Sequence, residues 1–144
     1  MRPASIVWFE RLYLGSLALG LVSSAFNWSS LTAAAEATPG ASGFIGSPAF
    51  MLSVMAFSLA ISLVFWYLIA RRGSKVAKWI VTIFTVLGLL GLPGTLSNPA
   101  FGPSIIAFSL INTLLQLAAV VCLFRPDTVD WFNGKRPADP DVFN

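Results

Sequence analysis

The chain has 144 residues and a net charge of +3 at pH 7, and it is 56% hydrophobic but only 10% charged. Water-soluble domains contain about 25% charged residues, so this composition excludes an ordinary soluble domain and predicts an integral membrane protein. The chain has no histidine and only one cysteine, which excludes histidine-ligated metal or haem, a Ser-His-Asp triad and an intrachain disulfide.

The first apolar segment follows a short charged N-terminus. Residues 12–26 carry no charge, and a membrane-spanning helix needs about 20 apolar residues, so we predict a first span over about residues 5–27. Arg2, Arg11, this segment and the Ala-Glu-Ala sequence at residues 35–37 together resemble a secretory signal peptide. The candidate cleavage site lies far beyond the end of the apolar segment, however, and this favours a retained span.

The next 21 residues, 27–47, are rich in Ser, Ala, Gly and Pro, with Glu36 as their only charge. This composition is typical of a loop. Beyond it, three more apolar segments predict spans over about residues 49–70, 76–92 and 104–124. We expect Gly91, Pro93 and Gly94 to end the third span, because proline lacks the N–H that a helix interior uses.

A short amphipathic segment follows the fourth span. We expect a helical turn over residues 127–132 at the membrane surface, with Asp127 as its N-cap and with Trp131 and Phe132 directed toward lipid. The sequence thus predicts one membrane domain over residues 1–132 and a polar cytoplasmic tail over residues 133–144.

The distribution of positive charge predicts the orientation. Four of the nine Lys and Arg residues, which we call the basic turn, surround the connection between the second and third spans: Arg71, Arg72, Lys75 and Lys78. The connections after the first and third spans contain no Lys or Arg, and cytoplasmic loops carry an excess of both. The expected fold is therefore an all-α integral membrane protein, a compact bundle of four transmembrane helices with both termini cytoplasmic. The basic turn would set this topology and anchor the chain to anionic lipid.

The fourth span carries four polar residues, which we call the polar face: Ser109, Asn112, Thr113 and Gln116. Helical spacing places them within about 100° of one another around the helix axis. Amides in hydrocarbon are costly unless they are hydrogen-bonded. The polar face therefore indicates either hydrogen bonds to a neighbouring helix, which is the commoner role, or a pathway or ligand site between helices.

Two further features predict contacts. Ser16, Gly20 and Ser24 recur every four residues in the first span, a spacing that lets helices approach closely. We expect this stripe to pack within the chain, with contact to another subunit as the alternative. Glu10 is the only acid close to a span. We expect it to pair with Arg11 or with the basic turn, and a functional acid at the mouth of a pore is the alternative.

No motif of a nucleotide-binding, hydrolytic or metal-binding enzyme occurs in the sequence. We therefore predict a non-enzymatic protein with no cofactor, no metal and no nucleic-acid partner. Its general organisation resembles that of small proteins of the bacterial inner (plasma) membrane, a resemblance that implies no activity. The leading hypothesis is an accessory subunit or self-associating scaffold, whose partners are membrane lipids, copies of itself or other membrane subunits. The alternative is a small oligomeric transporter or channel for a neutral or apolar solute that uses the polar face.

Overall fold

The computed structural model describes residues 3–36, 47–99 and 101–133. It contains six helices there: α1 (Ala4–Phe26), α2 (Trp28–Glu36), α3 (Pro48–Ala70), α4 (Lys75–Ser97), α5 (Pro103–Leu123) and α6 (Pro126–Phe132). Four of them, α1, α3, α4 and α5, are long and apolar enough to cross a membrane, and the described residues form no strand. The expected all-α bundle of four spans is confirmed.

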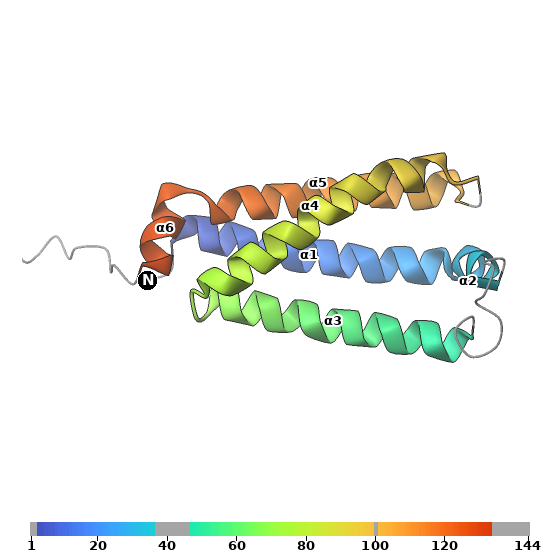
Figure 1. Ribbon diagram of the computed structural model, residues 1–144, viewed down its shortest axis with the longest axis horizontal. Coiled ribbons are helices and arrows are strands. Elements are labelled where there is room, and N and C mark those ends of the chain that lie inside the picture. The colour runs from blue at the N-terminus through green and yellow to red at the C-terminus, as the bar shows by residue number, and fades with distance from the viewer. Residues whose placement is uncertain (1–2, 37–46, 100, 134–144) are drawn as a thin grey trace, which may run out of the picture.

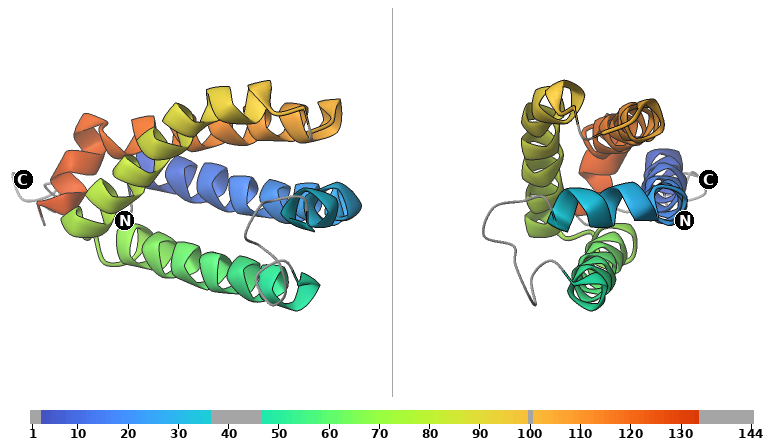
Figure 2. Two further views of the ribbon diagram at one scale, coloured as in Figure 1. Left: turned by 45° about the vertical axis from the view of Figure 1, so that its right-hand side comes forward. Right: turned by 90° about the vertical axis from the view of Figure 1, so that its right-hand side faces the viewer.

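The spans are arranged around α1, which lies between α3 and α5 (Figure 1). Helix α4 begins beside the end of α3 and runs obliquely, so that it lies beside α5 at the opposite end of the molecule (Figures 1 and 2). The start of α1, the basic turn and α6 share one end, which we call the basic end. Helix α2 lies at the other end, which we call the distal end.

The hydrophobic core is concentrated at the basic end. It is built from one end of each span and from α6, through Ile6, Phe9, Tyr13, Ile69, Ala70, Ala77, Val81, Ala119, Leu123 and Phe132. Elsewhere the spans are mostly uncovered: the buried share of the most apolar stretch is 28% in α1 but only 6% in α3. The core therefore holds the spans together at the basic end, while α3 and α4 diverge from one another toward the distal end (Figure 1).

Local sequence signals account for the beginnings of the helices. Ser47 and Ser74 cap α3 and α4, because their hydroxyl oxygens accept hydrogen bonds from the N–H groups of Phe50 and Ala77 at 3.2 and 3.3 Å. Proline occupies the first turn of α3, α5 and α6, where its missing N–H is not needed. Gly73 has a φ of +59°, which lets the chain reverse between α3 and α4.

The prediction of a loop over residues 27–47 was wrong for its first part, because residues 28–36 form α2. The alanine-rich sequence favours a helix, and the Thr32 hydroxyl bonds to the carbonyl oxygens of Trp28 and Ser29. Residues 37–46 of that predicted loop and residues 134–144 of the tail predicted over 133–144 lie outside the described residues.

The predicted end of the third span was also wrong, because α4 continues through Pro93 to Ser97. Proline removes one backbone N–H from the helix, and membrane helices tolerate this where nearby hydroxyl groups bond to the carbonyl oxygens. The Ser97 hydroxyl donates to the carbonyl oxygen of Pro93 at 2.9 Å in the last turn of α4, whereas the carbonyl that loses its N–H partner is that of Leu89, four residues before the proline.

Helix α6 departs from the expectation of a turn lying on the lipid surface. Its N-cap is Arg125, and Asp127 instead sits in its first turn, because Pro126 takes the first helical position. Phe132 is buried in the core at the basic end, and Trp131 packs against that core. The expectation that both aromatic residues face lipid was therefore wrong.

Candidate functional site

The polar face of α5 lies against a cavity between α4 and α5. The cavity has a volume of about 200 Å³, and all four residues of the polar face line it. Helix α4 supplies the opposite wall, with Thr85, Gly88, Leu89, Leu92 and Thr95. Helix α4 runs obliquely and comes to lie beside α5 along this stretch (Figure 2).

The side chains of the polar face do not act as hydrogen-bonding contacts between the described helices. Thr113 donates to the carbonyl oxygen of Ser109 on its own helix at 2.8 Å, as threonine commonly does in a helix. The Oδ1 atom of Asn112 is buried and has no hydrogen-bond partner among the described residues. A buried, unpaired amide oxygen costs about 1–3 kcal/mol, so the packing role expected for the polar face is not what the geometry shows at Asn112.

A second, larger cavity of about 420 Å³ adjoins the first. Its walls come from all four spans: Tyr13 from α1, then Phe57, Ser58, Ile61, Ser62 and Phe65 from α3, Val81, Phe84 and Thr85 from α4, and Gln116 from α5. Thr85 and Gln116 line both cavities, so the two spaces meet at that level. The lining combines hydroxyl groups with aromatic rings.

The two cavities are uncharged. None of the residues that line them is acidic or basic. Several of their hydroxyl groups besides that of Thr113 already donate a hydrogen bond. Tyr13 donates to the carbonyl oxygen of Ser62 at 3.3 Å and Thr85 to that of Val81 at 2.9 Å. The Ser62 hydroxyl donates to the carbonyl oxygen of Ser58 at 2.8 Å. Asn112 therefore presents the acceptor that an occupant could satisfy. A charged molecule would find no counter-charge there.

The cavities are closed at one end. Tyr13 and Val81 belong both to the lining of the larger cavity and to the core at the basic end. In the other direction, Thr95 places the smaller cavity near the distal end of α4. The larger cavity is therefore bounded by packed side chains at the basic end, but it is open at the side of the bundle, where Phe57 and Phe84 in its wall are 68% and 61% exposed.

The stripe of small residues in α1 is only partly used within the chain. Ser16 is buried, and its hydroxyl donates to the carbonyl oxygen of Tyr13 at 2.8 Å. Ser24 is half-buried. A Cβ atom added at Gly20 would meet no other atom within 4 Å, so the close helix contact expected at Gly20 is not formed.

The basic turn contacts protein as well as the surroundings of the bundle. Arg71 pairs with Glu10, its Nη2 atom lying 4.0 Å from Oε1, as expected from the position of Glu10 in the sequence. The Nζ atom of Lys75 donates to Oδ1 of Asn133 at 2.8 Å. Arg72 is exposed.

Lys78 is the buried member of the basic turn. Its Nζ atom lies 4.0 Å from the ring centroid of Phe124 and 5.2 Å from that of Phe132. These distances are within the range of cation–π attraction. Arg71 at the end of α3 thus helps to join α3 to α1, as expected, while Lys75 and Lys78 help to join α4 to α6 and to the end of α5. The sequence prediction of a lipid anchor did not include these contacts of the two lysines.

Two polar contacts that join distant segments were missed by the sequence analysis. The carboxylate of Asp127 accepts hydrogen bonds from the N–H and the hydroxyl of Ser5, at 3.2 and 2.9 Å, and so ties α6 to the first turn of α1. At the distal end, the hydroxyl of Ser104 donates to Oδ1 of the buried Asn27 at 2.6 Å. The sequence shows that Asp127 is an acid just after Pro126 and that Asn27 is an amide at the end of a span. Neither feature identifies the residue that it contacts.

The contacts of Asp127 change its acidity. Partial desolvation raises its pKa, but the hydrogen bonds from Ser5 and from the backbone N–H groups of Asp127 and Thr128 together lower it by more. The net result is a pKa below the ordinary value for aspartate. The ionised carboxylate is therefore the form that joins α6 to α1.

The described residues contain no group of three or more side chains suited to hold a metal ion. The sequence matches no family model, and neither a curated protein nor a solved structure is detectably similar to it.

Proposed function

We propose that this integral membrane protein is a non-enzymatic binder of a small, uncharged molecule that has both a polar and an apolar part. The molecule would occupy the paired cavities between the spans. The observation that carries the proposal is the unpaired, buried Oδ1 atom of Asn112 beside a cavity. An occupant with a hydroxyl or amide donor would satisfy this oxygen, and its apolar part would lie among the rings of Phe57, Phe65 and Phe84.

This proposal corresponds to the neutral-solute hypothesis drawn from the sequence. The volumes of about 200 and 420 Å³ suit an occupant of modest size, since ligand pockets commonly measure about 300–1,000 Å³. Carrying such a molecule across the membrane would require the packed side chains at the basic end to separate. We therefore propose binding as the activity. Transport would require, in addition, that the bundle open at the basic end.

A different observation favours the accessory or self-associating role. Helix α3 is almost uncovered, with 6% of its most apolar stretch buried, and its small residues Ala56 and Ala60 are exposed. A small-residue face of this kind lets another helix approach closely. The test is native mass spectrometry of the protein in nanodiscs: a homo-oligomer or a co-purified membrane subunit supports this role, and a strictly monomeric protein opposes it.

We further propose that the protein lies in a bacterial inner membrane with its basic end in the cytoplasm. The basic turn and the start of α1 share that end (Figure 1), and positive charge favours the cytoplasmic side. Cysteine substitutions in a Cys122→Ala background test the orientation. An impermeant thiol reagent added to intact cells should label Pro99→Cys and not Asp130→Cys, and the reverse pattern would contradict it.

Photolabelling with a short-chain alcohol that carries a diazirine tests the binding proposal. The alcohol is uncharged, donates a hydrogen bond and has an apolar chain. We expect adducts on the cavity-lining residues of α3, α4 and α5, because the cavity holds the probe beside them. An excess of the same alcohol without the diazirine should suppress these adducts.

Matched variants locate the site. Replacing both amides, Asn112→Leu and Gln116→Leu, should abolish the saturable adducts, whereas Ser53→Leu on exposed helix α3 should leave them unchanged, since Ser53 lines neither cavity. Adducts spread over the exposed residues of all four spans, and unaffected by the double variant, would show that the probe only dissolves in the bilayer.

A further inference from the structure

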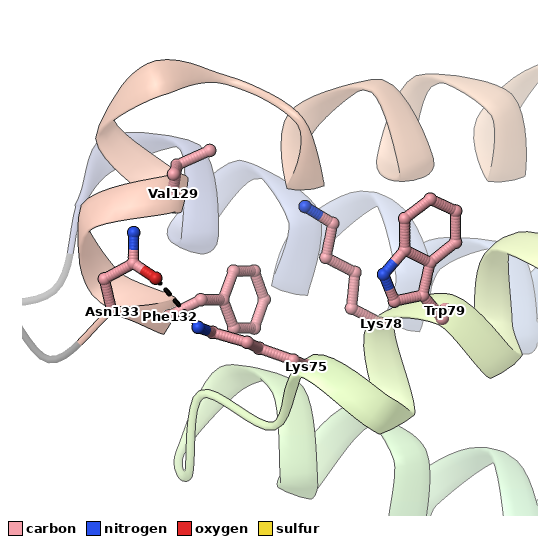
Figure 3. A pocket seen from close by; sticks show the side chains of 6 residues that line it. All are labelled: Lys75, Lys78, Trp79, Val129, Phe132 and Asn133. Atoms are coloured by element: carbon pink, nitrogen blue, oxygen red, sulfur yellow. Dashed lines mark hydrogen bonds between the residues drawn. The ribbon is translucent and has the colours of Figure 1, made fainter.

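A separate pocket lies at the basic end, between α4 and α6. Its volume is about 190 Å³, and Lys75, Lys78, Trp79, Val129, Phe132 and Asn133 line it (Figure 3). It shares no lining residue with the two uncharged cavities. Two of its six lining residues are cationic and none is acidic. The pocket therefore differs in charge from the proposed site along α5.

Lys78 is the feature that calls for a ligand. Only 9% of its surface is exposed, and lysine is almost never buried so far unless it is paired. Among the residues that the structure describes, no carboxylate lies within salt-bridge distance of its Nζ atom, which instead faces the rings of Phe124 and Phe132. The faces of these rings attract the charge, but they leave its N–H donors without a carboxylate or phosphate to neutralise them.

The other polar groups of the pocket are also donors. Lys75 lies one helical turn before Lys78, and its Nζ atom is bonded to Oδ1 of Asn133 at 2.8 Å. This bond occupies the oxygen of Asn133 and leaves its NH₂ group as a donor. Figure 3 shows the Lys75 side chain extending from α4 to Asn133 at the end of α6, and the Lys78 side chain extending from the next turn of α4 toward the end of α5. Two ammonium groups and an amide donor around one space favour an oxyanion.

We propose that this pocket binds the phosphate group of an anionic phospholipid, with Lys78 as the central ligand and Lys75 and Asn133 at its rim. Its position supports a lipid as the source of the phosphate. The pocket lies at the end of the spans, where head groups lie, and the outer surface of α4 beside it is apolar, with Val76 69% and Trp79 57% exposed. Acyl chains can lie along these residues while the head group enters the pocket. The space is several times the roughly 30 Å³ share of one liquid water molecule.

Native mass spectrometry of the detergent-solubilised protein, titrated with phosphatidylglycerol, tests the proposal. The wild type should retain one lipid molecule, and Lys78→Gln should weaken its binding by about tenfold or more, because a charge-assisted hydrogen bond is lost. Arg72→Gln is the matched control. It removes one exposed charge from the same end of the molecule without touching the pocket, so it should weaken binding by about threefold or less.

Lys75→Gln provides a second pocket variant at an exposed position, and it carries the test if Lys78→Gln does not fold. Equal losses for the pocket variants and Arg72→Gln, or no retained lipid in the wild type, would overturn the proposal. A parallel titration with inorganic phosphate separates the two sources of the group. If free phosphate binds as tightly as the lipid, and if Lys78→Gln weakens both to the same extent, a phospholipid is not the source of the bound phosphate group.

Discussion

Asp127 brings together two segments that are 122 positions apart in the sequence. Its carboxylate accepts two hydrogen bonds from Ser5 at the start of α1, where the exposed N–H groups of a helix favour a negative charge. Thr128 next to it is fully buried and donates to the carbonyl oxygen of Cys122. These contacts make α6 part of the bundle.

Replacing Asp127 with Ala should therefore destabilise the folded protein by about 1 kcal/mol at pH 7, a modest value because the carboxylate is exposed to water. The pKa of Asp127 in the folded protein is below its ordinary value of 3.8. Its stabilising effect is therefore present above that pH and is lost as the pH falls through the folded-state pKa, below about pH 4. Thermal unfolding in detergent at pH 7 and pH 3 measures both effects.

Asp130→Ala is the control, since Asp130 is an exposed acid on the same short helix. Protonation of the Asp127 carboxylate at low pH should lower the stability of the wild type and of Asp130→Ala. The Asp127→Ala variant lacks this carboxylate and should not show that loss. If Asp127→Ala is no less stable than Asp130→Ala at pH 7, the link between α6 and α1 does not contribute to stability.

The residues of the polar face could be found from the sequence, because helical spacing alone places Ser109, Asn112, Thr113 and Gln116 on one side of a helix. The sequence does not show what these four residues contact. Whether Asn112 meets another helix or a cavity depends on how α4 lies beside α5, and the spacing of residues within α5 carries no information about that. In the same way, a lysine in a basic turn indicates topology, but the burial of Lys78 depends on α6 folding back over it.

At the scale of the elements, the turn between α3 and α4 determines how α4 departs from the bundle. Gly73 is the one described residue here with a positive φ. A Cβ atom on it would lie 3.3 Å from Nε1 of Trp131 and would crowd the indole ring. The turn at Gly73 therefore packs closely against Trp131 at the end of α6, with little room for a side chain at position 73.

Gly73→Ala should destabilise the protein by about 1–2 kcal/mol, the cost of a left-handed conformation for an L-residue. Gly15→Ala is the matched change in the interior of α1, where an added Cβ meets nothing within 4 Å, and it should stabilise by about 0.5–1 kcal/mol because alanine favours a helix. Chemical unfolding in mixed micelles compares the two. Equal effects of the two substitutions would contradict the role assigned to Gly73.

The existence of the four spans was predictable because each span carries a long apolar sequence. The boundaries of the spans were less predictable. Hydropathy reports which residues tolerate lipid and does not report where hydrogen bonding ends, so α2 was missed and α4 was cut short at Pro93. In both of these stretches a side-chain hydroxyl bonds to a carbonyl oxygen of the preceding helical turn, as at Thr32 and Ser97.

At the scale of the whole molecule, the bundle is tight at one end and open along its length. The core at the basic end fixes the spans relative to one another, while the smaller cavity lies between α4 and α5 and the larger one is lined by all four spans. This arrangement divides the protein into a charged end suited to a head group and an uncharged interior suited to a neutral molecule. The two proposed sites share no residue, so each can be removed without the other.

The most direct test of this account is the reactivity of cysteines placed along α5 in a Cys122→Ala background, in nanodiscs. A thiol reacts as its thiolate, which needs water, so a cavity and lipid give different rates. With the small neutral reagent methyl methanethiosulfonate, Asn112→Cys and Gln116→Cys should react at least about tenfold faster than Leu114→Cys, because Leu114 is 66% exposed outside both cavities. Equal rates at the three positions, or faster reaction at Leu114→Cys, would contradict the claim that the polar face of α5 lines an accessible cavity.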